Sequence, residues 1–454
     1  MKVAGIIKRK EVKAIKKLVD DFLDRYGMHY AAINIGKEVD KFISEMDAGL
    51  KGSESSLKMI PTFIGFQKDL YPLEPVIALD AGGTNLRSAI ISFNKEGGHE
   101  LRNYTQSEMP GVEREVTAEE FFSAIADNLQ DKPEFCKRLG FVFSYPIEIY
   151  PDRDGRLIRF TKEIKARQVE GRFIGKGLME ELNKRGNNNI EEIVLLNDTV
   201  ALPLSGIAAL RQRQFSSYIG LVLGTGMNIC YIEKNSNITK LPRPTLDPDS
   251  YQLVNIEAGG YLKGPCGVID REFDRSTRDP GYSTYEKMFS GAYLGSIVTE
   301  VTRFAVKDSM FTAGFCRAFN RFEGFTSKDI DDYLYFPPLD ARLISLLEKM
   351  DEKDRIFMHF LLDAMVERAA VLTAIVLSSS IIKTDTGYDP CSPVCIVAEG
   401  SSFYKMKNFG PRIDYYMKKA LSAKDLYHFE IKRVEDAVMV GAAVAGFSPC
   451  CRLI

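Results

Sequence analysis

The chain has 454 residues, of which 45% are hydrophobic and 27% are charged, and its formal net charge is −2 at pH 7. This length exceeds what a single hydrophobic core normally organises, so two or three domains are expected. The balanced charge argues against a surface for nucleic acid or anionic membranes, and no apolar run is long enough to cross a bilayer.

The first predicted elements are two helices within residues 10–50, because apolar residues recur there at intervals of three and four. From Val76 the pattern changes to short apolar runs that are typical of strands. These runs are 76–80, 87–93, 139–145 and 193–198. Helical patterns at 117–130 and 173–185 separate them, and this alternation predicts an α/β domain.

A second section with strand-like runs begins after residue 206. Two apolar runs flank a Gly/Thr turn at 217–233, a helical region covers 283–380, and a strand–turn–helix pattern at 394–407 precedes a final helix at 436–446. In this section Ile219, Leu221 and Gly224 repeat Ile77, Leu79 and Gly82 at a constant offset. The repeat predicts two related halves, although two unrelated hairpins would give the same pattern.

The first glycine-rich turn joins the runs 76–80 and 87–93. A buried carboxylate, Asp80, precedes Gly82 and Gly83, and Thr84 and Arg87 follow. A Gly-Gly pair allows positive φ and a close approach to a ligand, successive N–H groups can bind an anion, and Asp80 suits hydrated Mg²⁺. The stretch is neither a Walker A loop nor a dinucleotide fingerprint. A plain hairpin turn capped by Asp80 is the alternative.

Two further turns have the same composition. Thr225 and Gly226 lie between the runs of 217–233, and Gly400 and Ser401 follow the run that ends near 398. Two Gly/Thr hairpins that face one another across a cleft can hold a triphosphate, and the third turn would then contact the nucleoside. Each turn alone also fits an ordinary connection between elements.

Carboxylates and amides follow several of the runs. Asn197 and Asp198 stand where a strand gives way to a helix, so Asp198 is either a helix N-cap or a general base at the carboxyl end of a strand. Asn228, Glu257 and Glu286 have the acceptor groups that a polyol requires, although each is also compatible with a surface or capping role.

The eight cysteines lack the spacing of a metal site, and even Cys391 and Cys395 have no histidine nearby. A chain of this size does not need disulfides, and its basic N-terminal segment lacks the apolar core of a signal peptide. Reduced thiols and a cytoplasmic location are therefore expected.

The order of the motifs along the chain is distinctive. They occupy 55–64, 77–87, 139–147, 159–166, 195–201, 220–228, 254–260 and 285–296. In this order and spacing the sequence resembles the eukaryotic-type hexokinase family, which includes the glucokinases. The resemblance extends from about residue 30 to the final helix.

The resemblance implies an α/β fold of the actin-like ATPase superfamily, related to ribonuclease H, with two lobes around a deep cleft. The smaller lobe would span 72–205 with a returning C-terminal helix at 437–454. The larger lobe would comprise 1–71 and 206–436.

The resemblance also implies the site residues. Asp198 would be the catalytic base, with Lys162 as the second catalytic residue. The sugar ligands would be Ser144, Thr161, Lys162, Asn197, Asp198, Asn228, Glu257 and Glu286. The nucleotide ligands would be Asp80, Gly82, Gly83, Thr84, Asn85, Arg87, Thr225, Gly226, Gly400 and Ser401. Asp80 would also hold Mg²⁺, through water.

The implied activity is transfer of the γ-phosphoryl group of Mg-ATP to the 6-hydroxyl of glucose and related hexoses, the first step of glycolysis. A catalytically silent sugar sensor and a non-kinase actin-like ATPase are the alternatives. The expected partners are hexose and ATP, without nucleic acid or membrane, and the expected state is a monomer or homodimer. Two departures concern the nucleotide: Glu399 replaces a usual aspartate, and Asp436 stands near a usual lysine.

Overall fold

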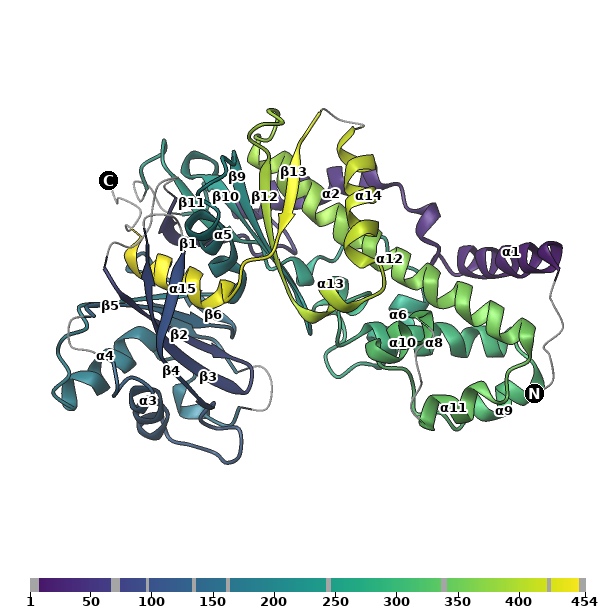
Figure 1. Cartoon of the computed structure of the whole chain (residues 1–454), viewed down its shortest axis with the longest axis horizontal. Helices are drawn as coiled ribbons and strands as arrows, with labels where there is room; N and C mark the ends of the chain where they lie inside the picture. The colour runs from purple at the N-terminus through teal and green to yellow at the C-terminus, as the bar shows by residue number, and fades with distance from the viewer. Residues whose placement is uncertain are drawn as a thin grey trace.

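The structure is a computed structural model that describes residues 8–66, 74–94, 98–132, 136–160, 164–241, 246–335, 341–422 and 426–448. Its described strands form two large sheets and a small ribbon, β6 (Ile147–Ile149) with β7 (Gly155–Leu157). Figure 1 shows the two sheets at one end of the molecule and a long helical part at the other.

The first sheet has five strands. In spatial order they are β4 (His99–Glu108), β3 (Asn85–Phe93), β2 (Val76–Gly82), β5 (Arg138–Phe143) and β8 (Glu192–Leu196). The strands β2, β3 and β4 pair antiparallel, whereas β5 and β8 continue the sheet parallel to β2. Alternation along β2 sends Ile77 and Leu79 into one core and Val76 and Ala78 into another, as a strand covered on both faces requires.

The second sheet has six strands. In spatial order they are β1 (Ile60–Gly65), β11 (Tyr251–Asn255), β10 (Met227–Lys234), β9 (Ser217–Leu223), β12 (Val394–Glu399) and β13 (Phe429–Lys432). Without β1 its order and strand directions repeat those of the first sheet, with β9 in the place of β2. The predicted relation between the two halves is therefore confirmed at the level of topology.

Helices cover both faces of each sheet. The first sheet packs on α3 (Ala118–Asp127) and α4 (Ile174–Lys184) on one face, and on α15 (Ala437–Phe447) on the other. The second sheet packs on α5 (Asp198–Ala209) on one face and on α12 (Glu352–Thr384) on the other. The pair α5 and α15 therefore forms the layer between the two sheets (Figure 1).

The remaining helices surround α12 or continue the helical part. They are α1 (Arg9–Arg25), α2 (Ile35–Lys51), α6 (Val268–Ser276), α7 (Thr284–Lys287), α8 (Leu294–Lys307), α9 (Ala313–Phe319), α10 (Ser327–Tyr335), α11 (Ala341–Leu347), α13 (Ser401–Lys405) and α14 (Phe409–Ser422). Short 3-10 turns lie at Tyr30–Ala32, Arg167–Val169, Asn235–Asn237 and Ala258–Gly260. Over the part of the chain that is described, no helix has both the length and the apolar character needed to span a membrane.

The predicted helices and strands are present at the expected positions, within a few residues at each end. The sequence patterns did not indicate the strands β1, β4, β11 and β13. The first sheet draws its strands from 76–196 and the second from 60–65 and 217–432, while the lobe limits themselves stay a prediction.

Glycines allow the layer between the sheets to pack closely. A Cβ on Gly441 of α15 would lie 1.9 Å from the carbonyl oxygen of Ala201 in α5. A Cβ on Gly220 of β9 would lie 2.5 Å from the carbonyl oxygen of Thr199, and one on Gly140 of β5 would lie 1.7 Å from that of Ala442. Backbone therefore meets backbone at each crossing, and no side chain fits between them.

We predict that Gly441→Ala lowers the free energy of unfolding by about 1–3 kcal/mol, because the added methyl group forces the two helices apart. The measurement is urea-induced unfolding followed by circular dichroism. Gly410→Ala in α14 is the matched control, since a Cβ there would meet only Phe403, at 3.9 Å. Equal stability of the two variants would contradict the close crossing.

Candidate active site

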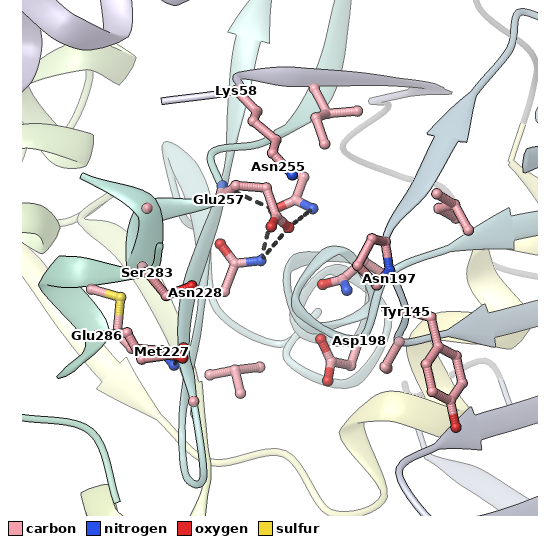
Figure 2. A pocket seen from close by; sticks show the side chains of 18 of the residues that line it. Lys58, Tyr145, Asn197, Asp198, Met227, Asn228, Asn255, Glu257, Ser283 and Glu286 are labelled. Carbon is pink, nitrogen blue, oxygen red and sulfur yellow. Dashed lines mark hydrogen bonds between the residues drawn. The ribbon is translucent and has the colours of Figure 1, made fainter. Parts of the chain in front are cut away.

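A cavity of about 730 Å³ lies between the two sheets. Its walls come from the segment after β5, the junction of β8 with α5, the β9–β10 turn, the segment after β11, and α7. Six of the predicted sugar ligands line it: Ser144, Asn197, Asp198, Asn228, Glu257 and Glu286. Figure 2 shows Asn197 and Asp198 at the end of a helix on one side, with Asn228, Glu257 and Glu286 opposite them.

The first turn of α5 fixes the orientation of Asp198. Asn197 is the N-cap, and its Oδ1 accepts a hydrogen bond from the Thr199 amide at 2.9 Å. The Asp198 Oδ1 accepts from the same amide at 2.7 Å and from the Thr199 hydroxyl at 3.2 Å. No hydrogen bond from a described residue reaches Oδ2, so this oxygen can accept a proton from a bound molecule. The N-cap is therefore Asn197 and not Asp198, which is the first residue of the helix, so the alternative role predicted for Asp198 as the N-cap is wrong.

Across the cavity, three side chains form a closed network. The Asn228 Nδ2 donates to Asn255 Oδ1 at 2.8 Å and to Glu257 Oε1 at 3.2 Å, and the Asn255 Nδ2 donates to the same Glu257 oxygen at 2.8 Å. Glu257 has a φ of 59°, in the left-handed region that residues other than glycine seldom adopt. Such strain persists only where surrounding contacts impose it, and here it directs the carboxylate into a network that lines the cavity.

Glu286 approaches the β9–β10 turn from α7. Its Oε2 accepts a hydrogen bond from the Met227 amide at 2.8 Å. Burial raises the pKa of this carboxyl group, and the nearby Glu257 charge adds to that effect. A Cβ on Gly226 would lie 2.7 Å from the same Oε2 atom. The glycine thus has a structural role in addition to its predicted contact with the nucleotide.

The segment after β5 connects the cavity to the first glycine-rich turn. The Ser144 hydroxyl is a buried group for which the described residues provide no hydrogen-bond partner. Tyr145 also lines the cavity, and its hydroxyl donates to the Gly83 carbonyl at 2.6 Å. Burial and the neighbouring Asp80 raise the pKa of this phenol. A molecule bound in the cavity could therefore form a hydrogen bond with Ser144. The first glycine-rich turn lies next to this wall of the cavity, through the bond between Tyr145 and Gly83.

The predicted nucleotide residues fall into two groups. Thr225 and Gly226 line the cavity, and Gly400 packs against their turn, because a Cβ on Gly400 would meet the Leu223 carbonyl oxygen at 2.2 Å. Ser401 begins α13 directly after it. The other group forms the end of the β2–β3 hairpin: Asp80, Gly82, Gly83, Thr84, Asn85 and Arg87.

This second group does not belong to the described lining of the cavity. Asp80 is 8% exposed and faces Arg87 across the strand pair, with 3.7 Å between its Oδ2 and the arginine Nη1. No group of three or more metal-binding side chains occurs in the described part of the chain. A single carboxylate provides too few ligands for a resident metal, whereas it fits a hydrated Mg²⁺ that nucleotide phosphates also hold.

Two predicted residues, Thr161 and Lys162, lie outside the described residues. Conversely, sequence reasoning missed Asn255, Tyr145 and Lys58, which also line the cavity (Figure 2). The sequence did contain a signal for each of them. Asn255 stands two residues before Glu257, Tyr145 stands next to Ser144, and Lys58 lies within the motif at 55–64. The pattern did not show that they turn toward the same space.

Comparison with known proteins identifies the family of the chain. Residues 218–448 match a protein-family model described as hexokinase, and residues 19–207 match a second model with the same description. The chain belongs to the hexokinase family. The predicted resemblance is therefore confirmed.

Among its relatives, Hexokinase-1 of Schizosaccharomyces pombe is 30% identical over 302 residues, which are 63% of this chain and 61% of that protein. The hexokinase of Kluyveromyces lactis is 29% identical over 427 residues, 88% of this chain and 83% of that protein. The chain thus spans about three-fifths of the first relative's length.

The solved structure of a Schistosoma mansoni hexokinase complexed with glucose matches with a TM-score of 0.74 and 22% identity, covering 96% of this chain and 99% of that chain. Another hexokinase structure matches with a TM-score of 0.75 and 19% identity, covering 97% and 99%. These matches show that the chain has the fold of the solved hexokinases, in agreement with the predicted α/β fold.

We predict that Asn255→Asp weakens the binding of glucose, used as a polyol probe of the cavity, at least about tenfold. The substitution keeps the shape, but Glu257 loses a donor and meets a like charge. Calorimetric titration with glucose tests this prediction. Asn237→Asp is the matched control, because the exposed Asn237 amide donates to Glu233 at 2.7 Å away from the cavity. Unchanged glucose binding in Asn255→Asp would show that the network does not support the site.

Glu286→Gln is expected to stabilise the fold near pH 7.5. Because the pKa of Glu286 is raised by burial, its charged form destabilises the folded chain at pH values above that pKa. Glutamine removes the charge and can still accept from the Met227 amide. Thermal unfolding at several pH values should give a gain that shrinks as the pH falls through the folded pKa. The exposed Glu323→Gln is the control, and a gain of the same size there would contradict the prediction.

Proposed function

We propose that this protein is a hexokinase that transfers the γ-phosphoryl group of Mg-ATP to the 6-hydroxyl of glucose or a related hexose, the first step of glycolysis. The observation that carries the proposal is the grouping of Asp198 with the acceptor groups of Asn228, Glu257 and Glu286 around one cavity. A polyol needs several such acceptors for its hydroxyl groups, and Asp198 supplies a base for one of them.

In the proposed reaction the sugar O6 attacks the γ-phosphorus, and the bond from that phosphorus to the β,γ-bridging oxygen breaks. The proton of the 6-hydroxyl passes to Asp198. The hydrogen bonds on Asp198 Oδ1 support this role, since they hold the carboxylate of a residue that lines the cavity and leave Oδ2 without a hydrogen bond from a described residue. We also propose that Ser144, Thr161, Asn197, Asn228, Glu257 and Glu286 orient the sugar, which raises its effective concentration at the base.

The phosphate end of the reaction would depend on cations and backbone amides. We propose that Lys162 and Arg87, with the amides of Gly82, Gly83, Thr84, Asn85, Thr225 and Gly226, stabilise charge on the transferring group, and that Gly400 and Ser401 contact the nucleoside. When bound, Mg²⁺ would neutralise phosphate charge and be held by Asp80 through water. Tyr145, between Gly83 and the cavity, supports a link between the phosphate and sugar ends.

The proposal extends to lobe movement, cellular location and oligomeric state. The smaller lobe would comprise 72–205 and 437–454, and the larger lobe 1–71 and 206–436. Sugar binding is expected to bring these two lobes together, so that water does not replace the hexose as the phosphoryl acceptor. The free thiols of the described cysteines support a cytoplasmic location. We propose a monomer or homodimer whose partners are its small substrates, without nucleic acid or membrane.

The two alternative functions make different predictions. A non-kinase ATPase would release ADP without sugar, and a silent sensor would bind sugar without releasing ADP. A coupled assay for sugar-dependent ADP release separates all three. Because Asp436 and Glu399 are acidic where the nucleotide is expected, the assay should compare ATP, GTP and polyphosphate as donors against a panel of hexoses.

We predict that Asp198→Ala lowers kcat by about 10²–10⁴-fold or more but leaves glucose binding within severalfold. The coupled assay gives turnover, and calorimetry gives the glucose Kd. Asp249→Ala is the control, because the Asp249 side chain is 88% exposed, pairs with Lys234 and is not part of the cavity lining. Normal turnover in Asp198→Ala would overturn the assignment of the base.

A further inference from the structure

One contact joins the two sides of the cavity. The Arg159 guanidinium lies over the ring of Tyr282, 5.1 Å from its centroid. Arg159 follows the β6–β7 ribbon, which packs with the first sheet, whereas Tyr282 belongs to the segment between α6 and α7, which packs with the second. Both residues line the cavity and are exposed.

The segment that carries Tyr282 is held rigidly to α7. The Lys287 side chain is 4% exposed, and its Nζ donates to Asp274 Oδ1 at 2.7 Å, to the Thr277 hydroxyl at 2.8 Å and to the Asp279 carbonyl at 2.6 Å. These bonds join the end of α6, the segment 277–282 and α7 in one unit. A change in the position of Tyr282 is therefore expected to change the position of α7 and of Glu286, the residue of α7 that lines the cavity.

On the other side, Arg159 precedes the proposed sugar ligands Thr161 and Lys162 by two and three residues. The backbone beside it is fixed, since the Ile158 amide donates to the Pro146 carbonyl at 2.9 Å. The Arg159–Tyr282 contact thus joins two described segments that line the cavity from opposite sides.

We propose that Arg159 and Tyr282 are positioning residues that hold the two sides of the cavity together over the bound sugar. This proposal rests on the proposed function for its effect on sugar, although the contact itself can be tested without sugar. A cation–π contact at an exposed site contributes modestly, so losing it should weaken glucose binding about two- to fivefold. Because neither side chain is placed on the reacting atoms, KM should rise while kcat stays nearly constant.

The test without sugar is hydrogen exchange measured by mass spectrometry. Arg159→Gln should speed the exchange of amides in 277–283, where Gly281 and Tyr282 donate to Asp274 and Asp279. Arg156→Gln is the matched control, because Arg156 also lies over a tyrosine, Tyr150, but on the same ribbon and outside the cavity. Unchanged exchange in Arg159→Gln, or the same change in the control, would show that the Arg159–Tyr282 contact does not restrain this segment.

The test with sugar is a double-mutant cycle measured as glucose Kd and KM. Arg159→Gln and Tyr282→Leu should each weaken binding, and together they should weaken it no more than either alone. Arg159→Lys and Tyr282→Phe, which keep a cation and a ring, should bind nearly as the wild type does. Additive losses or unaffected binding would overturn the positioning role. Failure of the wild type itself to bind glucose would instead contradict the proposed function. The exchange experiment would still show whether the Arg159–Tyr282 contact restrains the segment 277–283.

Discussion

The close crossing of α5 with α15 and β9 is the constraint on which the site depends. At Gly441 and Gly220 the backbones are so close that a single added carbon would collide with a carbonyl oxygen. Packing of this kind has few alternative arrangements, because neither helix can rotate or slide without a clash. It therefore fixes where α5 begins, and with it the position of Asp198.

The opposite wall of the cavity is built in a different way. Glu257 and Glu286 approach one another near the β9–β10 turn, and two carboxylates in one site repel unless donors compensate them. Asn228 and Asn255 provide such donors to Glu257, and the Met227 amide provides one to Glu286. Burial, with the Glu257 charge as a smaller contribution, raises the pKa of Glu286 despite the hydrogen bond from the Met227 amide. Under the proposed function, hydroxyl groups of the sugar would donate to these carboxylates and stabilise their charged forms.

Sequence patterns predicted what depends on local periodicity and missed what depends on tertiary contacts. The strand β2 alternates between two apolar cores and was found, whereas β4 is an edge strand with mostly exposed polar residues and has no such signal. Asp198 and Glu257 stood out as carboxylates after strands. Asn255 did not, because its role depends on the pairing of β10 with β11, which brings it opposite Cys230 and within reach of Asn228.

The strand ends explain why motifs so far apart in the sequence meet. Ser144 follows β5, Asn197 follows β8, Glu257 follows β11 and Gly400 follows β12, so each of these four residues comes after the carboxyl end of a strand. In parallel α/β sheets that edge is where ligands bind, since the loops there are free to carry polar groups while the strands stay buried. Two sheets of the same topology, separated by α5 and α15, contribute such loops to one cavity. A donor and an acceptor that must react can then be held by separate sheets, and movement of one sheet relative to the other would bring them together.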